Sequence, residues 1–176
     1  MTEWQQESPT ADLSGMWTVR LDPGDAGVGE RWFAQSLAGE TIRLPGTTCE
    51  NGIGEPLAME AVLSRETVRS LRQRFRYVGP AWYQRAIRVP AEWSGKRIRL
   101  FLERVMFQSR VWVDGKEAGM QDSLSTPHVF DLSDLLEPGK THLLTIRVDN
   151  REHHRIGVHP SAYTDETQTI WNGVVG

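Results

Sequence analysis

The stretch from residue 163 to residue 172 holds side chains of the kinds that bind sugars. The rings of Tyr163 and Trp171 offer flat apolar faces for the C–H patches of a sugar ring. Planar or hydroxyl groups that bond sugar hydroxyls surround them, namely Thr164, Asp165, Glu166, Gln168 and Asn172. The pattern favours glycan contact, while a purely structural interpretation also fits, with Trp171 packed in a core and Asn172-Gly173 forming a turn.

Other reactive residue types lack the partners that their chemistry needs. Retaining glycoside hydrolysis takes two carboxylates about 5–5.5 Å apart. Asp114, however, lies in a turn sequence, and the acids of residues 131–137 flank a helical turn, where acids have structural roles. No Gly-x-Ser-x-Gly sequence anchors a catalytic serine, Cys49 lacks the context of a nucleophile, and the histidines of residues 153–159 lack metal-binding partners. We therefore expect no catalytic residue, metal site or cofactor in this chain.

Strands must position these residues, because apolar side chains recur at every second position in several segments. The alternating sets are Ile98, Leu100 and Leu102, then Leu144, Ile146 and Val148, and Tyr83, Ile87 and Val89 opposite Gln84 and Arg88. Such alternation predicts a sheet with one buried face. We expect earlier strands at residues 16–21 and 41–44. The tryptophans inside strand patterns, Trp17, Trp82 and Trp112, are expected to pack in the core or to cover a sheet.

Turn sequences separate the predicted strands at short intervals. Asp114-Gly115 lies between two short runs and predicts a hairpin. Helix is scarce: residues 133–137 predict one short turn, and residues 57–72 are the longer candidate. Short strands at this spacing with few helical turns predict an all-β fold, a β-sandwich or jelly roll.

Composition excludes several functional classes. The chain has 176 residues, with 23 acidic and 20 Lys or Arg side chains and a net charge of −3, which argues against nucleic-acid binding. No apolar run approaches the roughly 20 residues of a membrane-spanning helix. Residues 1–9 are polar and show no secretory signal. The sequence alone does not determine the compartment.

Three segments, taken in order, resemble a known family. They are YVGPAWYQR at residues 77–85 followed by IRVPAEWSGKR at 87–97, VWVDGK at 111–116 followed by TPHVFDLSDLLEPG at 126–139, and IRVDN at 146–150 with WNGVVG at 171–176. This series resembles the N-terminal sugar-binding domain of glycoside hydrolase family 2, which includes β-galactosidases, β-glucuronidases and β-mannosidases. The resemblance covers residues 13–176.

The resemblance implies a galactose-binding-domain-like jelly roll that precedes an immunoglobulin-like domain and a (β/α)₈ barrel. In that family the barrel holds both catalytic glutamates. We therefore expect residues 1–12 to form a flexible tail and residues 13–176 to form a non-catalytic sandwich, cut from a longer retaining β-glycosidase. Its expected partners are a β-glycoside and the downstream domains.

The resemblance also indicates site residues. In the family's β-galactosidases, the loop before the equivalent of Trp171 reaches the active site, and an acid two positions before that tryptophan helps to bind the sugar. This sequence has Thr169 there, so galactose specificity is in doubt, and Asp165 and Gln168 are candidate substitutes. A second candidate is the loop of residues 51–56 with Asn51, whose glycines also suit ordinary turns.

Two other functions fit the sequence. One is a free-standing carbohydrate-binding module with its own site, which would bind monosaccharides at millimolar concentrations. The other is an interaction domain without a sugar role, for which the loop of residues 165–172 would fold back into the core.

Overall fold

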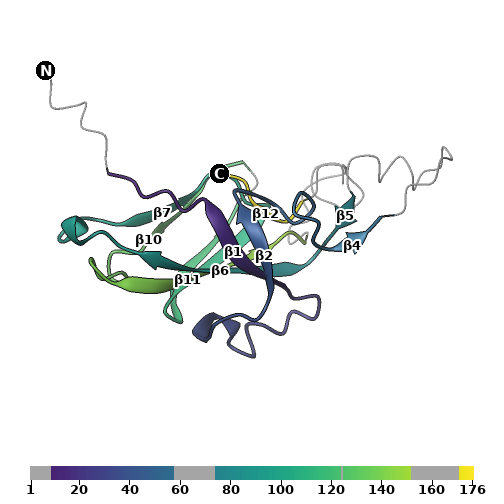
Figure 1. Ribbon diagram of the computed structural model, residues 1–176, viewed down its shortest axis with the longest axis horizontal. Helices are drawn as coiled ribbons and strands as arrows, with labels where there is room; N and C mark the ends of the chain where they lie inside the picture. Colours follow the sequence, from purple (N-terminus) through teal and green to yellow (C-terminus); the bar gives the residue numbers. More distant parts are fainter. Residues whose placement is uncertain (1–8, 58–73, 124, 152–170) are drawn as a thin grey trace, which may run out of the picture.

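A computed structural model describes residues 9–57, 74–123, 125–151 and 171–176 (Figure 1). Strands dominate it, and the helical elements of this part are two short 3₁₀ turns, η2 (Trp32–Ala34) and η3 (Ala91–Trp93). The strands are β1 (Gly15–Leu21), β2 (Glu40–Leu44), β3 (Gly46–Thr47), β4 (Glu55–Pro56), β5 (Phe75–Arg76), β6 (Pro80–Arg88), β7 (Arg99–Leu102), β8 (Gln108–Val113), β9 (Lys116–Asp122), β10 (His128–Asp131), β11 (Thr141–Asp149) and β12 (Gly173–Val174).

The strands form two layers. The larger layer is an antiparallel sheet in the order β2-β1-β6-β11-β8-β9. The second layer contains the pairs β10-β7 and β12-β3, and an isolated bridge pairs Val174 of β12 with Val105, which follows β7 in the chain. Between the layers lies one apolar core, to which the larger sheet contributes Trp17, Tyr83, Leu144 and Ile146 and the second layer Leu100, Leu102, Phe130 and Val174. The predicted all-β jelly-roll sandwich is confirmed.

At its centre the larger sheet is buried on both faces, whereas the alternation of apolar residues in the sequence predicts one buried face. On the outer face, Trp32 of η2 joins Trp82 and Trp112 in a second cluster, and the segment around η2 lies below the sheet in Figure 1. The side chain of Gln84 accepts a hydrogen bond from the Leu37 amide (2.8 Å) and donates to the Gln35 carbonyl (2.9 Å). Gln84 is therefore buried, not exposed, because residues 22–37 cover it.

The predicted turns occur where the sequence places them. Asp114 (φ 48°) and Gly115 (φ 78°) connect β8 to β9 with two left-handed residues, the type I′ geometry that suits a twisted hairpin. The amides of Leu135 and Leu136 both donate to the Leu132 carbonyl, which forms the predicted short turn. Most of the segment considered as a helix, residues 57–72, lies outside the described residues. The expected boundary between a tail of residues 1–12 and a domain that begins at residue 13 stays a prediction. No helix of the described part is long and apolar enough to cross a membrane.

Candidate functional site

Asn150 fixes the point where the chain leaves β11. Its side chain is fully buried. The Nδ2 group donates to the carbonyls of Tyr77 (2.9 Å) and Trp171 (3.1 Å), and Oδ1 accepts from the Gly79 amide (2.8 Å). One amide thus satisfies three backbone groups from segments distant in sequence, so the start of the segment after Asn150 has a fixed position.

Asn172 fixes the point where the chain returns, and it also uses Gly79. Its Nδ2 donates to the Gly79 carbonyl (2.8 Å), and its Oδ1 accepts from the Tyr83 hydroxyl (2.7 Å). The Thr48 amide donates to the Asn172 carbonyl (2.8 Å), and this bond connects Asn172 to the residue that directly follows β3. The two asparagines therefore hold both ends of the segment between them against Gly79.

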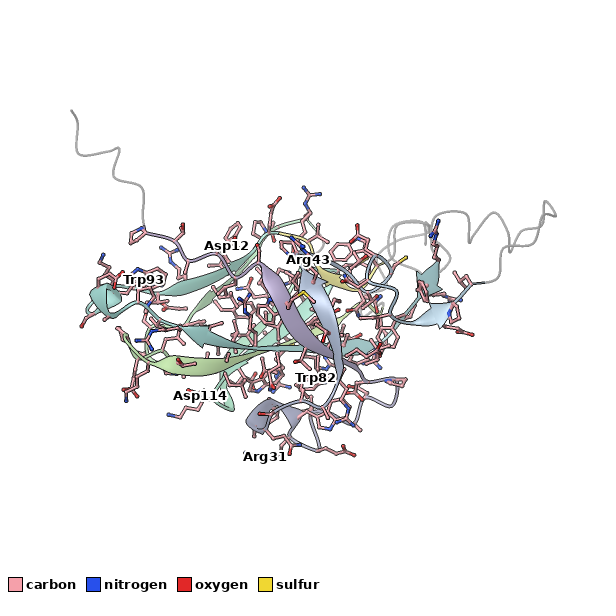
Figure 2. All side chains as sticks on the ribbon, in the orientation of Figure 1. Asp12, Arg31, Arg43, Trp82, Trp93 and Asp114 are labelled. Carbon is pink, nitrogen blue, oxygen red and sulfur yellow. The ribbon has the colours of Figure 1, made fainter. Side chains whose placement is uncertain are left out.

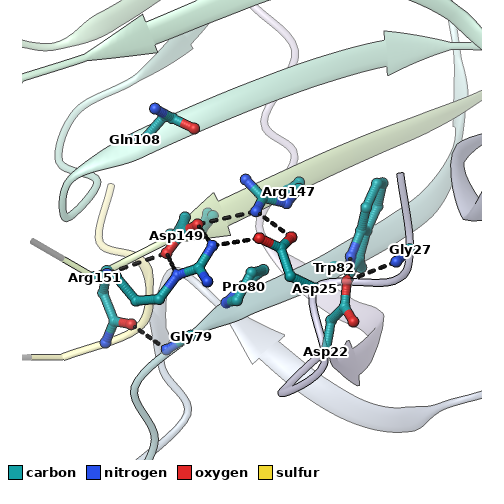
Figure 3. Close-up of polar contacts among 12 residues, drawn as sticks. Asp22, Asp25, Gly27, Gly79, Pro80, Trp82, Gln108, Arg147, Asp149 and Arg151 are labelled. Carbon is teal, nitrogen blue, oxygen red and sulfur yellow. Dashed lines mark hydrogen bonds and ion pairs between the residues drawn. The ribbon is translucent and has the colours of Figure 1, made fainter. Parts of the chain in front are cut away.

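An ionic network surrounds the first of these points (Figure 3). Asp149 is fully buried, and both of its oxygens accept from the Arg151 guanidinium, at 2.9 and 2.6 Å. Arg151 and Arg147 also reach the Asp25 carboxylate, at 2.6 and 2.8 Å, and Arg147 reaches Asp149 at 2.9 Å. Two guanidinium groups thus share two carboxylates, which links β11 to the turn at Asp25 on the outer face of the sheet.

The network determines the charge of its acids. Burial would raise the pKa of Asp149, but the hydrogen bonds from Arg151 and the charge of Arg147 outweigh burial and hold that pKa below its usual range. The pKa of Asp25 is lowered in the same way, because bonds from Arg151 and Arg147 outweigh its desolvation. Both carboxylates are ionised at neutral pH, so neither has the raised pKa that a general acid needs.

Asp22 has a structural role beside this network (Figure 3). Its carboxylate accepts from the amides of Ala26 (2.8 Å) and Gly27 (2.9 Å) and from the Trp82 indole (2.9 Å). The described residues contain no group of three His, Cys, Asp or Glu side chains placed to hold a metal ion. The hydrogen bonds of Asp22 therefore hold the turn at residues 26–27 against Trp82.

The sequence-predicted residues lie in different settings. Trp171 is half-buried and packs against Met106 and Phe107. Asn172 is buried, with its amide used by the bonds described above. Asn51 accepts from the Arg43 amide (2.9 Å) and donates to the Thr47 carbonyl (2.8 Å), so its amide closes the turn after β3. Asp165 and Gln168 lie outside the described residues.

The structure brings two of the predicted regions together. The turn that holds Asn51 follows β3, and β3 pairs with β12 directly after Trp171 and Asn172, with Thr47 opposite Gly173. The connection from β5 to β6 also meets this point, because Asn150 and Asn172 bond to residues 77–79. We call this end of the sandwich the anchor; it is formed by residues 47–51, 77–79, 150 and 171–172.

Comparisons with known proteins decide the family. Residues 10–174 match the family described as "Glycosyl hydrolases family 2, sugar binding domain". This chain belongs to that family. A β-glucuronidase of Paenibacillus borealis is 30% identical over 139 residues, which are 79% of this chain and 21% of the relative. A β-galactosidase of Thermoanaerobacter pseudethanolicus is 30% identical over 83 residues, 47% of this chain and 11% of that protein.

Solved structures support the fold of this family 2 domain. The β-glucuronidase of Ruminococcus gnavus in complex with uronic deoxynojirimycin matches with a TM-score of 0.62 and 22% identity, over 81% of this chain and 22% of that chain. The chain spans about a fifth of the length of the β-glucuronidases that it matches.

Two fully buried polar residues stand at the end of β11, with Asp149 in its last position and Asn150 directly after it. Asn150 and Asp149 belong to the IRVDN segment used for the family resemblance, yet no site role is predicted for them from sequence. Their position in the sequence could have indicated a role, because these two polar residues directly follow an alternating apolar pattern and precede Arg151. Their partners Gly79 and Asp25 are far away in sequence, so only the fold reveals the bonds.

Proposed function

We propose that this chain is the non-catalytic sugar-binding domain of a longer retaining β-glycosidase, whose catalytic acids lie outside these 176 residues. The observation that carries the proposal is the anchor of this family 2 domain. Asn150 and Asn172 hold both ends of the segment that carries Asp165 and Gln168 against the same residue, Gly79. Segments that contact ligands are commonly loops held by a rigid scaffold, and the anchor supplies such a scaffold.

In this proposal the segment between Asn150 and Trp171 borders the active site of the longer enzyme. Asp165 and Gln168 bond the hydroxyls of a β-glycoside, Trp171 packs beside them, and an immunoglobulin-like domain and a barrel are the partners. The pairing of β3 with β12 places the Asn51 turn next to the end of that segment. This supports a place for Asn51 at the same edge of the proposed active site, which we call the rim.

Kinetics of the longer enzyme test the rim. We expect Asp165→Ala and Gln168→Ala to raise KM for 4-nitrophenyl β-D-glucuronide about tenfold, since a lost hydrogen bond to a sugar hydroxyl costs about 1 kcal/mol or more. Asp134→Ala, on an exposed turn, serves as the matched control and should leave KM unchanged. Unchanged KM and kcat in both rim variants would remove these residues from the site.

A further inference from the structure

His128 of β10 is a fully buried histidine between the two layers. Side chains from both layers meet in the space between them (Figure 2), and those of the core cluster are apolar. The imidazole of His128 is instead polar and titratable. Its Nδ1 lies 2.6 Å from Oγ of Ser109, a fully buried residue of β8 in the larger sheet. The ring therefore makes a hydrogen bond between the layers, in a place where a charge is costly.

The hydrogen bonds of His128 determine which ring nitrogen carries the proton. Its Nε2 lies 3.2 Å from the Ser123 carbonyl oxygen, and since a carbonyl can only accept, we assign the proton to Nε2. Nδ1 then has no proton and accepts from the Ser109 hydroxyl. A second proton on Nδ1 would force that hydroxyl to turn away, and it has no other hydrogen-bond partner among the described residues. The arrangement thus fits the neutral imidazole.

The surroundings of His128 offer little compensation for a charge on the ring. Asp122, the last residue of β9, is the carboxylate whose charge acts on it, and the core face of β11 is apolar. The other charged side chains of the neighbouring strands are exposed or partly exposed, namely Arg99 of β7, Glu103 directly after it, Arg110 of β8, Lys116 and Glu117 of β9 and Asp131 of β10. Burial lowers the pKa of His128 below its ordinary value of 6.5, although the bond to Ser123 and the charge of Asp122 raise it.

The bond to Ser123 connects His128 to the segment that packs against Trp171. Ser123 directly follows β9, and its amide donates to the Phe107 carbonyl (3.1 Å). The Phe107 amide donates in turn to the Asp149 carbonyl (3.0 Å) at the end of β11. Phe107 belongs to the small buried cluster against which Trp171 packs. His128 therefore helps, through Ser123, to hold the support of Trp171.

We propose that His128 is an acid-sensitive link between the two layers. At neutral pH the neutral imidazole joins Ser109 to Ser123 and keeps Phe107 in place against Trp171. In acid the imidazole takes up a proton and the bond from Ser109 is lost, so the contact of Ser123 with Phe107 loosens while the larger sheet stays folded. The inference goes beyond the proposed sugar-binding role and does not depend on it, because it concerns the sandwich alone.

Thermal unfolding of the wild type and of His128→Phe at several pH values tests the link. Phenylalanine is similar in size to histidine and does not titrate. The unfolded histidine takes up its proton near pH 6.5 and the folded one at lower pH, so the stability is fully present above pH 6.5 and falls below it. The loss is up to tenfold in the folding equilibrium constant for each pH unit. Between pH 7 and pH 5 we expect the Tm of the wild type to fall by at least about 3 °C more than that of the variant.

Hydrogen exchange locates the loss within the fold. Between pH 7 and pH 5, after correction for the intrinsic rates, we expect the amides of Ser123 and Phe107 to lose at least tenfold more protection than the amide of Ile146 in the core of the larger sheet. In His128→Phe the ratio of these protections should stay constant, because the variant has no ring to protonate at this place.

Ser109→Ala keeps His128 and tests the same bond with a smaller change. The variant lacks the hydroxyl that donates to the neutral ring, so its His128 should take up a proton at higher pH than in the wild type, as followed by NMR of the imidazole nitrogens. Ser125→Ala is the matched control, since the side chain of Ser125 is exposed, and its midpoint should equal that of the wild type.

Any of three results would overturn the proposal. The first is a wild-type His128 that takes up its proton at or above pH 6.5, or that carries its neutral proton on Nδ1. The second is an equal acid loss of Tm, or an equal change in exchange at Ser123 and Phe107, in the wild type and His128→Phe. The third is the same His128 midpoint in the wild type and Ser109→Ala.

Discussion

At the level of single residues, two buried asparagines position the candidate rim. Asn150 satisfies three backbone groups of separate segments, while Asn172 bonds the Gly79 carbonyl and the Tyr83 hydroxyl. A buried polar group left without a partner costs about 1–3 kcal/mol. Asparagine suits this task because its side chain is short and offers both kinds of group. The ion pairs of Asp149 with Arg147 and Arg151 lie at the end of β11, next to Asn150.

Asn150→Ala tests the first asparagine. The change leaves the Gly79 amide and the carbonyls of Tyr77 and Trp171 unpaired in a buried place, so we expect the free energy of unfolding to fall by about 3 kcal/mol. Urea denaturation measures this fall. Gln108→Ala is the control, because Gln108 is partly exposed and makes a long bond to Asp122 (3.4 Å); we expect its effect to stay within about 0.5 kcal/mol. Equal effects of the two changes would refute the anchoring role of Asn150.

Asp149→Asn tests the ionic network through pH. Because the folded-state pKa of Asp149 lies below its unfolded value of about 3.9, its stabilisation is fully present above that value and is lost as pH falls toward the folded pKa. We expect the variant to be about 3 kcal/mol less stable than the wild type at pH 7, with the difference shrinking below about pH 4. Chemical denaturation from pH 7 to pH 3 measures it, and a difference that stays constant over this range would contradict the assignment.

At the level of elements, the pairing of β3 with β12 determines where the chain returns. A Cβ at Gly173 (φ 153°) would lie 2.3 Å from the Gly46 carbonyl oxygen and 2.8 Å from the Thr47 Cα. Only glycine fits this approach, since real Cβ atoms do not come so close to backbone. The strand pair and the anchor therefore depend on this one glycine.

Gly173→Ala is the corresponding prediction. We expect the free energy of unfolding to fall by more than about 2 kcal/mol, because the two backbones must separate. Gly95→Ala is matched to it: Gly95 also has a positive φ (72°), but a Cβ there meets no heavy atom within 4 Å, so only the backbone strain of about 1 kcal/mol remains. Thermal unfolding compares the two, and an equal loss would mean that the close approach is absent.

The strands could be predicted from sequence where one face is apolar, as in Leu144, Ile146 and Val148. The second cover of the larger sheet could not, because Gln84 has the polarity of an exposed residue and its partners Gln35 and Leu37 lie in a distant loop. The hairpin at Asp114-Gly115 could be predicted because its geometry depends on local residues alone. The predictions for Asp165 and Gln168 rest on the family resemblance and remain proposals.

At the level of the whole molecule, our proposal gives the sandwich the role of a scaffold and assigns the reaction to other parts of a longer protein. Asp25 and Asp149 are held as ions by two arginines, so they stabilise the fold and have no proton to give at neutral pH.

Assays of the 176-residue chain alone, beside the longer enzyme, test the central claim most directly. With 4-nitrophenyl β-D-glucuronide and β-D-galactoside as substrates, we expect no hydrolysis above the buffer rate by the chain alone and turnover by the longer enzyme. Calorimetric titration of the chain with glucuronate and galactose should give no saturable heat at millimolar sugar. Millimolar binding would instead identify a free-standing carbohydrate-binding module, and substrate turnover by the isolated chain would contradict a non-catalytic role.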